Sequence, residues 1–178
     1  AGLTPVKLNA VIVRGYNEGD VADLAGLPLD HSWQARFIEM MPFAGQTDFQ
    51  TSLVVSDKEI LEKITNELGK PILLNQGILD GEARLYRLPD AKGTLGFISS
   101  VTNPFCAGCT RARLTSDGKL RLCLLKEKEV DLLTPLRAGA TLSDLKELIL
   151  DGIWWKPWGH GLAQGEIATN RTMSQIGG

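Results

Sequence analysis

The chain has 178 residues, of which 43% are hydrophobic and 22% are charged, and its formal net charge is −2. This composition is typical of a folded protein with a hydrophobic core, and the charge gives no support for a general nucleic-acid-binding surface. No apolar run approaches the length of a membrane span, and we recognise no signal or transit pattern. We therefore expect neither a nucleic-acid partner nor membrane association. A chain of this length can form one compact domain or two small ones.

The first part of the chain alternates between strand and helix patterns. Residues 6–13 and 33–41 are rich in β-branched and apolar side chains, which is typical of buried parallel strands. Asn17 is a candidate cap for a short helix after the first strand, and Ser56 with Glu59 forms a capping box for a helix after the second. This order predicts a parallel sheet or barrel, although two strand–helix units are too few to close a barrel.

The pattern changes at Pro71, after which short apolar segments are separated by Gly, Asp and Pro. Such segments predict an antiparallel meander. The predicted strands cover residues 83–88, 95–101, 111–115 and 119–124, and a helix is predicted over residues 143–153. We therefore expect an α/β chain with a domain boundary that separates residues 1–75 from residues 76–178.

All three cysteines of the chain lie close together in the sequence, as Cys106-x-x-Cys109, then thirteen residues, then Cys123. This spacing is typical of a metal site. It suits a zinc ion, for which His160 would have to supply the fourth ligand, and it also suits an iron–sulfur cluster with one iron left open. An odd number of grouped cysteines argues against a secreted disulfide framework and favours the cytosol or an organelle interior.

The residues between the last two cysteines predict a β-hairpin with its turn at Asp117-Gly118. A two-residue loop would mix leucines and arginines on one face, whereas a three-residue loop with Gly118 in the left-handed conformation separates them. In that register one face carries Arg111, Arg113, Thr115, Lys119, Arg121 and Cys123, with Arg111 opposite Cys123. Guanidinium groups beside a metal site favour an anionic ligand such as phosphate, which tilts the prediction toward the cluster.

Three separated motifs then point to one family. They are Pro5-Val-Lys7-Leu-Asn9 followed by Arg36-Phe-Ile-Glu39-Met-Met41-Pro, the cysteine motif with its Arg111-x-Arg113-Leu-Thr segment, and the ending Arg171-Thr-Met173-Ser-Gln-Ile-Gly177-Gly178. In this order they resemble the MoaA family, the radical S-adenosylmethionine GTP 3′,8-cyclases that open molybdenum cofactor synthesis. The resemblance runs over essentially the whole chain.

The resemblance implies a fold and an activity. Residues 1–75 would be the last βα units of an incomplete TIM-like radical S-adenosylmethionine barrel, and residues 76–178 an α+β C-terminal domain whose antiparallel sheet carries an iron–sulfur site. The parent protein would be a lyase that converts GTP to (8S)-3′,8-cyclo-7,8-dihydroguanosine 5′-triphosphate in molybdopterin biosynthesis. It would use S-adenosylmethionine and a second 4Fe–4S cluster, form a homodimer, and share its pathway with a partner resembling cyclic pyranopterin monophosphate synthase.

The resemblance also implies roles for single residues. Cys106, Cys109 and Cys123 would hold a 4Fe–4S cluster with one open iron, and Met41 would pack on S-adenosylmethionine. The implied GTP contacts are Lys7, Arg36, Arg111, Ala112 and Arg113, and the implied active-site tail is Gly177 with Gly178. No residue of this chain is assigned as catalytic. The Cys-x-x-x-Cys-x-x-Cys motif of the first cluster does not occur in this sequence, so we expect this chain alone to be inactive.

Each of these residues also has an ordinary structural interpretation. Lys7 and Arg36 could lie at strand ends or pair with a carboxylate such as Glu39, because a buried charge needs a partner. Met41 could fill a core, and the two hairpin arginines could be solvated. The alternative function is therefore a non-catalytic binding module stabilised by zinc, in which His160 completes the four ligands.

Overall fold

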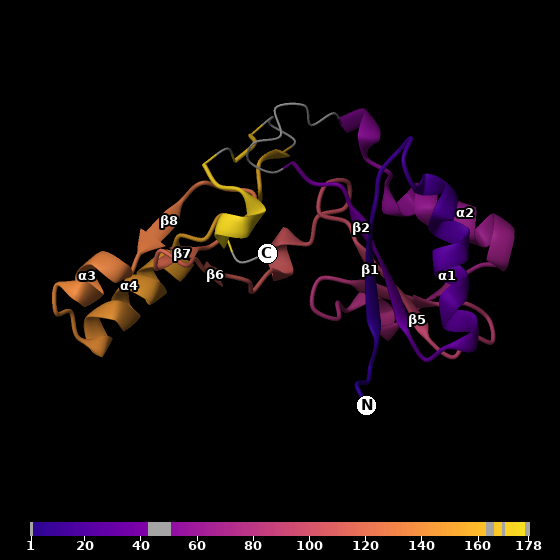
Figure 1. The fold of residues 1–178 in the computed structure, drawn as a ribbon, viewed down its shortest axis with the longest axis horizontal. Coiled ribbons are helices and arrows are strands. Elements are labelled where there is room, and N and C mark those ends of the chain that lie inside the picture. Colours follow the sequence, from indigo (N-terminus) through magenta and orange to yellow (C-terminus); the bar gives the residue numbers. More distant parts are fainter. Residues whose placement is uncertain (1, 43–50, 163–165, 169, 177–178) are drawn as a thin grey trace. The chain divides into compact units, whose positions relative to one another are not determined.

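The computed structural model of the chain describes residues 2–42, 51–162, 166–168 and 170–176 (Figure 1). They divide into two compact units, of which the first takes in residues 2–41 and 51–105 and the second takes in residues 42, 106–162, 166–168 and 170–176. The boundary between the two units lies at residue 106, because the strands between residues 75 and 106 belong to the sheet of the first unit. The family-domain boundary after residue 75 stays a prediction.

The first unit is built on a five-stranded mixed sheet with the order β1-β2-β5-β4-β3. Its strands are β1 (Lys7–Ile12), β2 (Gln34–Glu39), β3 (Ile72–Leu73), β4 (Arg84–Arg87) and β5 (Thr94–Ile98). β1, β2 and β5 are parallel, whereas β4 is antiparallel to both β5 and β3. The prediction that all these segments form one antiparallel meander is therefore wrong. β5 pairs in parallel with β2, which is far from it in the sequence, and β4 pairs with β5 and so belongs to the same sheet.

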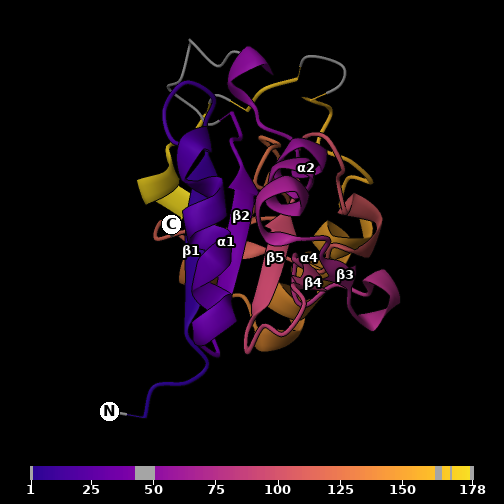
Figure 2. The ribbon, with the colours of Figure 1, turned by 90° about the vertical axis from the view of Figure 1, so that its right-hand side faces the viewer.

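Two helices, α1 (Val21–Asp30) and α2 (Asp57–Leu68), cover one face of the parallel strands (Figure 2). The core between these helices and the sheet is built from apolar side chains of both layers: Ile12, Val21, Ala25, Phe37, Ile60, Ile64, Leu95 and Phe97. The predicted capping box of α2 is confirmed, since the Ser56 hydroxyl accepts from the Glu59 amide and the Glu59 carboxylate accepts from the Ser56 amide. Short 3-10 turns lie at Glu18–Asp20, Thr51–Leu53 and Asn75–Gly77.

The predicted cap at Asn17 is wrong. Asn17 starts the 3-10 turn that precedes α1, but its side chain makes no capping hydrogen bond. Its Oδ1 atom accepts from the Val13 amide and its Nδ2 atom donates to the Val11 carbonyl, so the side chain closes the end of β1. The same short polar side chain that suits a helix cap also suits this turn.

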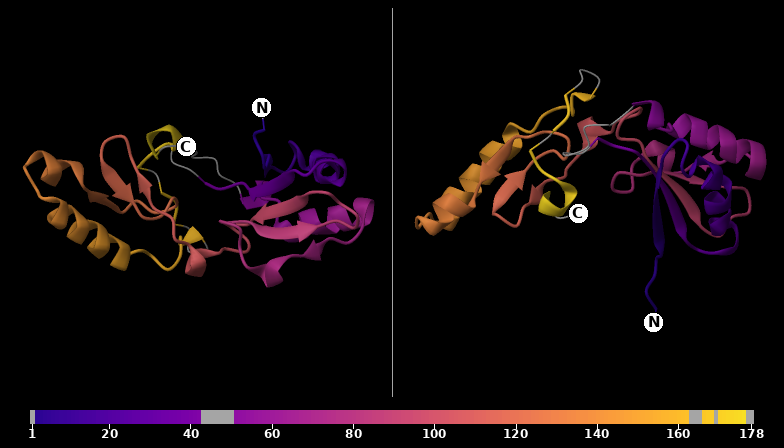
Figure 3. Two further views of the ribbon diagram at one scale, coloured as in Figure 1. Left: turned by 90° about the horizontal axis from the view of Figure 1, so that it is seen from below. Right: turned by 45° about the horizontal axis from the view of Figure 1, so that its top comes forward.

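The second unit holds an antiparallel sheet with the order β6-β7-β8. Its elements are β6 (Arg113–Leu114), β7 (Lys119–Arg121), β8 (Glu129–Asp131), α3 (Leu133–Arg137), α4 (Leu142–Trp154), and 3-10 turns at Cys106–Gly108 and Met173–Ile176. The three-residue hairpin loop is confirmed, because the Thr115 amide donates to the Lys119 carbonyl and Gly118 has a φ of +73°. α4 runs along this sheet (Figure 3), where its buried Gly152 approaches Val130 of β8.

Two elements of the second unit, β8 and α3, were not predicted. Both are very short, and neither carries a clear apolar period in the sequence. Within the described residues, no helix is both long and apolar enough to cross a membrane.

Candidate functional site

Two cations predicted to bind substrate lie together on the sheet face opposite α1 and α2. In the β1–β2 register Lys7 pairs with Gln34, and Asn9 pairs with Arg36, so all four residues face the same side. Lys7 Nζ and Arg36 Nη2 each lie 3.3 Å from the same oxygen, Oδ2 of Asp80. The hydrogen bond from Lys7 holds the pKa of Asp80 below its usual value, although partial burial opposes it.

Arg36 is further oriented by its neighbours in the sheet. Its Nε atom donates a short hydrogen bond to Gln34 Oε1. Across the ladder it faces Gly96 of β5, where an added Cβ would lie 3.0 Å from Arg36 Cγ. The absence of a side chain at Gly96 therefore leaves room for the stem of Arg36.

Glu39, the suggested carboxylate partner of these cations, has a different role. It is 2% exposed and accepts hydrogen bonds from the amides of Val101 and Thr102 at 2.7 and 2.9 Å, and from the Thr102 hydroxyl. The pairing of Lys7 and Arg36 with Glu39 is therefore wrong, because Glu39 faces the helix side and orders the loop after β5. Met41 lies two residues past the end of β2 and is partly exposed.

The three cysteines lie in the second unit, free of disulfides and half-buried. Cys106 opens a 3-10 turn, and the Cys109 amide donates to the Cys106 carbonyl at 3.1 Å. Burial raises the pKa of Cys123, and the charges of Cys106 and Cys109 raise it further. Cys106 and Cys109 therefore open and close one 3-10 turn, and Cys123 follows the hairpin of β6 and β7.

Lys156, which no motif of the sequence singled out, lies beside Cys109. Lys156 Nζ donates to the carbonyls of Cys109 and Arg111 at 2.7 Å each, and lies 3.5 Å from Cys109 Sγ. It follows α4, 47 residues after Cys109, and no local pattern in the sequence predicts the contact.

The ladder of paired residues in the hairpin is shorter than predicted. The β6–β7 ladder pairs Arg113 with Arg121 and begins at Arg113, so it does not extend to a pair of Arg111 with Cys123. The Arg111 carbonyl binds Lys156 instead. The side chains of Arg111 and its neighbour Ala112 are exposed, and Arg113 is half-buried.

Arg121 was predicted on the same hairpin face as Arg111 and Arg113. Its side chain is buried, with 2% exposure, and its contacts are structural. Its Nη1 atom donates to Glu129 Oε1 at 2.9 Å and to Asn170 Oδ1 at 3.0 Å. Arg171 binds Glu129 at 2.6 and 2.8 Å and Asp117 at 3.1 and 2.8 Å. These ion pairs attach the segment that contains Arg171 to the hairpin turn and to β8. The predicted tail residues Gly177 and Gly178 lie outside the described residues.

The side chains that could hold a metal centre in the second unit are the three thiols and His160. Among the described residues, no group of three or more His, Cys, Asp or Glu side chains is arranged around one metal ion. A 4Fe–4S cluster binds each thiolate through a different iron, so its ligands stand farther apart than those of zinc. His160 is 8% exposed, and its Nδ1 atom accepts from the Leu162 amide at 3.1 Å. Cys106, Cys109 and Cys123 supply thiol groups of the kind that hold iron–sulfur clusters and zinc ions.

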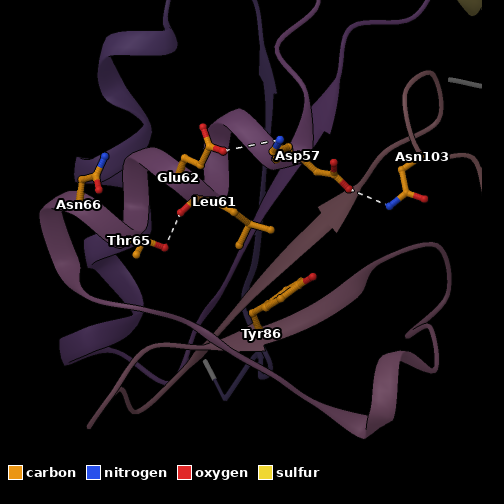
Figure 4. Close-up of a pocket in the computed structure, with 8 residues that line it drawn as sticks. Asp57, Leu61, Glu62, Thr65, Asn66, Tyr86 and Asn103 are labelled. Atoms are coloured by element: carbon orange, nitrogen blue, oxygen red, sulfur yellow. Dashed lines mark hydrogen bonds and ion pairs between the residues drawn. The ribbon is translucent and has the colours of Figure 1, made fainter.

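A separate hollow of about 570 Å³ lies on the first unit beside α2 (Figure 4). It is lined by Asp57, Lys58, Leu61, Glu62, Thr65, Asn66, Tyr86 and Asn103, none of which the sequence analysis selected. Asp57 accepts hydrogen bonds from Ser99 and Asn103 at 2.8 and 3.1 Å, and Lys58 pairs with Glu62. Asp57, Asn103, Lys58 and Glu62 are therefore already paired with other protein groups.

The chain is similar to known proteins over most of its length. The Molybdenum Cofactor Synthesis C family matches residues 33–162. The chain is 43% identical over 178 residues to the GTP 3′,8-cyclase of Pelotomaculum thermopropionicum, with 100% of the chain and 54% of that protein aligned. It is 42% identical to the GTP 3′,8-cyclases of Gloeobacter violaceus and Desulforamulus reducens, with 99% of the chain aligned to 55% and 54% of their lengths.

The chain spans about half the length of the curated relatives that it matches. The family pattern covers most of the chain, and the alignments with the cyclases run from one end of it to the other. The chain therefore belongs to the molybdenum cofactor synthesis C family and is homologous to the C-terminal part of GTP 3′,8-cyclases.

Proposed function

We propose that this chain is the GTP-binding part of a GTP 3′,8-cyclase and carries its substrate-side 4Fe–4S cluster. The observation that supports the proposal is the set of three free, half-buried thiols in the second unit, on a turn-and-hairpin segment that also carries Arg111 and Arg113. Cys106, Cys109 and Cys123 would hold the cluster, which supplies an iron atom able to coordinate the guanine base. The arginines, with the neighbouring Ala112, would bind and orient the nucleotide, since guanidinium groups form paired hydrogen bonds with phosphate.

The first unit would contribute the last part of a barrel. Its parallel strands carry helices on one face and Lys7, Asn9 and Arg36 on the other, which matches a barrel whose helices form the outer ring. Lys7 and Arg36 would then bind phosphate oxygens from the inner face. Met41, just past a strand carboxyl end, would pack on S-adenosylmethionine, and Gly177 with Gly178 would reach the active site.

The remaining parts of the proposal concern the whole protein. Its lyase activity would need S-adenosylmethionine and a second 4Fe–4S cluster, whose cysteine motif this sequence lacks. This chain alone would therefore not cyclise GTP in assays of the pure chain. The homodimer, the partner resembling cyclic pyranopterin monophosphate synthase and a cytoplasmic location also belong to this proposal and rest on the family relationship.

Metal analysis of the chain purified without oxygen tests the proposal directly. We expect about four iron and four sulfide per chain, with the broad visible absorption of an iron–sulfur cluster. Removal of the cluster with a chelator should abolish the absorption and weaken GTP binding. One zinc per chain without colour would contradict the proposal and support the zinc-stabilised module.

Replacement of Asp80 tests the phosphate-binding role of the first unit. In Asp80→Asn the cations Lys7 and Arg36 lose the carboxylate that they share, so a triphosphate meets no competing anion. Because Asp80 is partly exposed, we expect a gain of about 1 kcal/mol, or roughly fivefold tighter GTP binding. Fluorescence titration with a GTP analogue measures the effect.

Two comparisons make the Asp80 result specific. Asp90→Asn, at an exposed loop position of the same unit, should leave the affinity unchanged. Asp80→Asn in a Lys7→Met background should lose most of the gain. Weaker GTP binding by Asp80→Asn alone would contradict competition and show that the carboxylate organises the two cations.

A further inference from the structure

The ammonium group of Lys156 has an unusual set of acceptors. It donates to the backbone carbonyls of Cys109 and Arg111, both at 2.7 Å, and its third neighbour is Cys109 Sγ at 3.5 Å. A lysine has three N–H donors, so all three have an acceptor in the same short loop. Lys156 is itself partly buried, which strengthens these charge-assisted contacts.

The position of Lys156 in the fold makes this contact a tether. α4 ends at Trp154, and the amide of the next residue donates back to the carbonyls of Asp151, Gly152 and Ile153, which fixes the direction of the chain. The buried Gly152 in turn packs against Val130 of β8. Lys156 therefore links the cysteine loop to a helix that the sheet holds in place.

The contact also connects two groups with different proposed tasks. Cys109 is a proposed cluster ligand, and Arg111 is a proposed nucleotide contact one residue beyond Thr110. Because Lys156 holds both of their carbonyls, it sets the backbone from which both side chains project.

We propose that Lys156 is the positioning residue of the cysteine site. It fixes the Cys109–Arg111 backbone and places a positive charge beside the thiolate of Cys109, so that a bound cluster is easier to reduce. Hydrogen bonds and positive charge at a cluster sulfur stabilise the more negative, reduced state. The electrostatic half of this inference rests on the proposed function, whereas the tether concerns the metal-free chain as well.

Lys156→Met tests both halves, because methionine keeps an unbranched stem and removes the charge and the donors. In the metal-free chain, amide hydrogen exchange of the peptide around residues 106–113 should become at least several-fold faster. In the cluster-bound chain, a redox titration followed by visible absorption should give a more negative midpoint potential. Lys156→Arg should recover part of the potential, since it keeps the charge but presents a planar fork in place of a compact ammonium.

Lys146→Met is the matched control, because Lys146 is an exposed residue of α4 and its replacement changes the net charge equally. It should alter neither reading. Equal shifts in potential for both variants would indicate a long-range charge effect and overturn the positioning role. If Lys156→Met keeps both the amide exchange rates and the midpoint potential of the wild type, the whole inference is overturned. If the amide exchange becomes faster but the potential stays unchanged, only the electrostatic half is overturned. A wild-type chain without iron would contradict the proposed function instead, and the exchange rates would still decide whether Lys156 tethers the loop.

Discussion

Cys123→Ser should remove most of the iron from the chain while leaving the hairpin folded. Serine is a poor ligand for iron compared with a thiolate, and only two cysteines would remain. Cluster retention should fall by more than about tenfold, since the loss of even an indirect contact to a metal site has effects of this size. Iron and sulfide analysis after anaerobic reconstitution measures the loss.

The geometry around Cys123 separates a ligand effect from unfolding. Its backbone carbonyl accepts from Arg121 Nε at 3.2 Å and from the Lys126 amide at 3.4 Å, and neither bond involves the side chain. Circular dichroism of Cys123→Ser should therefore match the wild type. Ser116→Ala, at an exposed position of the same hairpin loop, should keep its iron. Full iron content in Cys123→Ser would exclude Cys123 as a ligand.

Glu129→Ala should destabilise the second unit by about 3–5 kcal/mol, because it leaves two partly or fully buried guanidinium groups without their shared carboxylate. The side chain of Arg121 is 2% exposed and that of Arg171 is 13% exposed, and both pair with Glu129. An arginine cannot lose its proton to escape the cost. Urea denaturation followed by tryptophan fluorescence measures the free energy of unfolding.

Glu147→Ala provides the control for Glu129→Ala, because Glu147 is exposed on α4 and its change to alanine suits a helix. A loss below about 1 kcal/mol for Glu129→Ala would show that solvent replaces the carboxylate. The double variant Glu129→Ala, Arg171→Ala should be less destabilised than the sum of the two single variants, because the two residues form one network.

The same network predicts how stability changes with pH. Burial raises the pKa of Glu129, but the hydrogen bonds from Arg171 and Arg121 outweigh it, so this pKa lies below its usual value of 4.5. Arg171 likewise lowers the pKa of Asp117. A carboxyl group with a depressed folded-state pKa stabilises the fold above its unfolded-state pKa. The free energy of unfolding should therefore decrease as the pH falls below about 4.5, and less steeply in Glu129→Ala.

The sequence by itself determined the features whose interactions span only a few residues. The capping box of Ser56 and Glu59 joins groups three positions apart, and the Asp117-Gly118 turn allowed one register that kept leucines and arginines on separate faces. The cysteine spacing and the neighbouring arginines also suggested an anion-binding cluster site and a family, and the comparisons confirmed the family. The assignment of ligands stays a prediction, because a motif names residues without positioning their atoms.

Only the tertiary structure decided which distant groups meet. Asp80 is 73 residues from Lys7, and the sequence suggested Glu39 as the carboxylate partner instead. Lys156 reaches Cys109 across 47 residues, and Arg171 reaches Asp117 across 54. The parallel pairing of β5 with β2 also depends on a crossover that no local pattern specifies. Charge and hydrogen-bonding capacity are properties of single residues, but the choice of partner depends on how the chain packs, and that packing is a property of the whole fold.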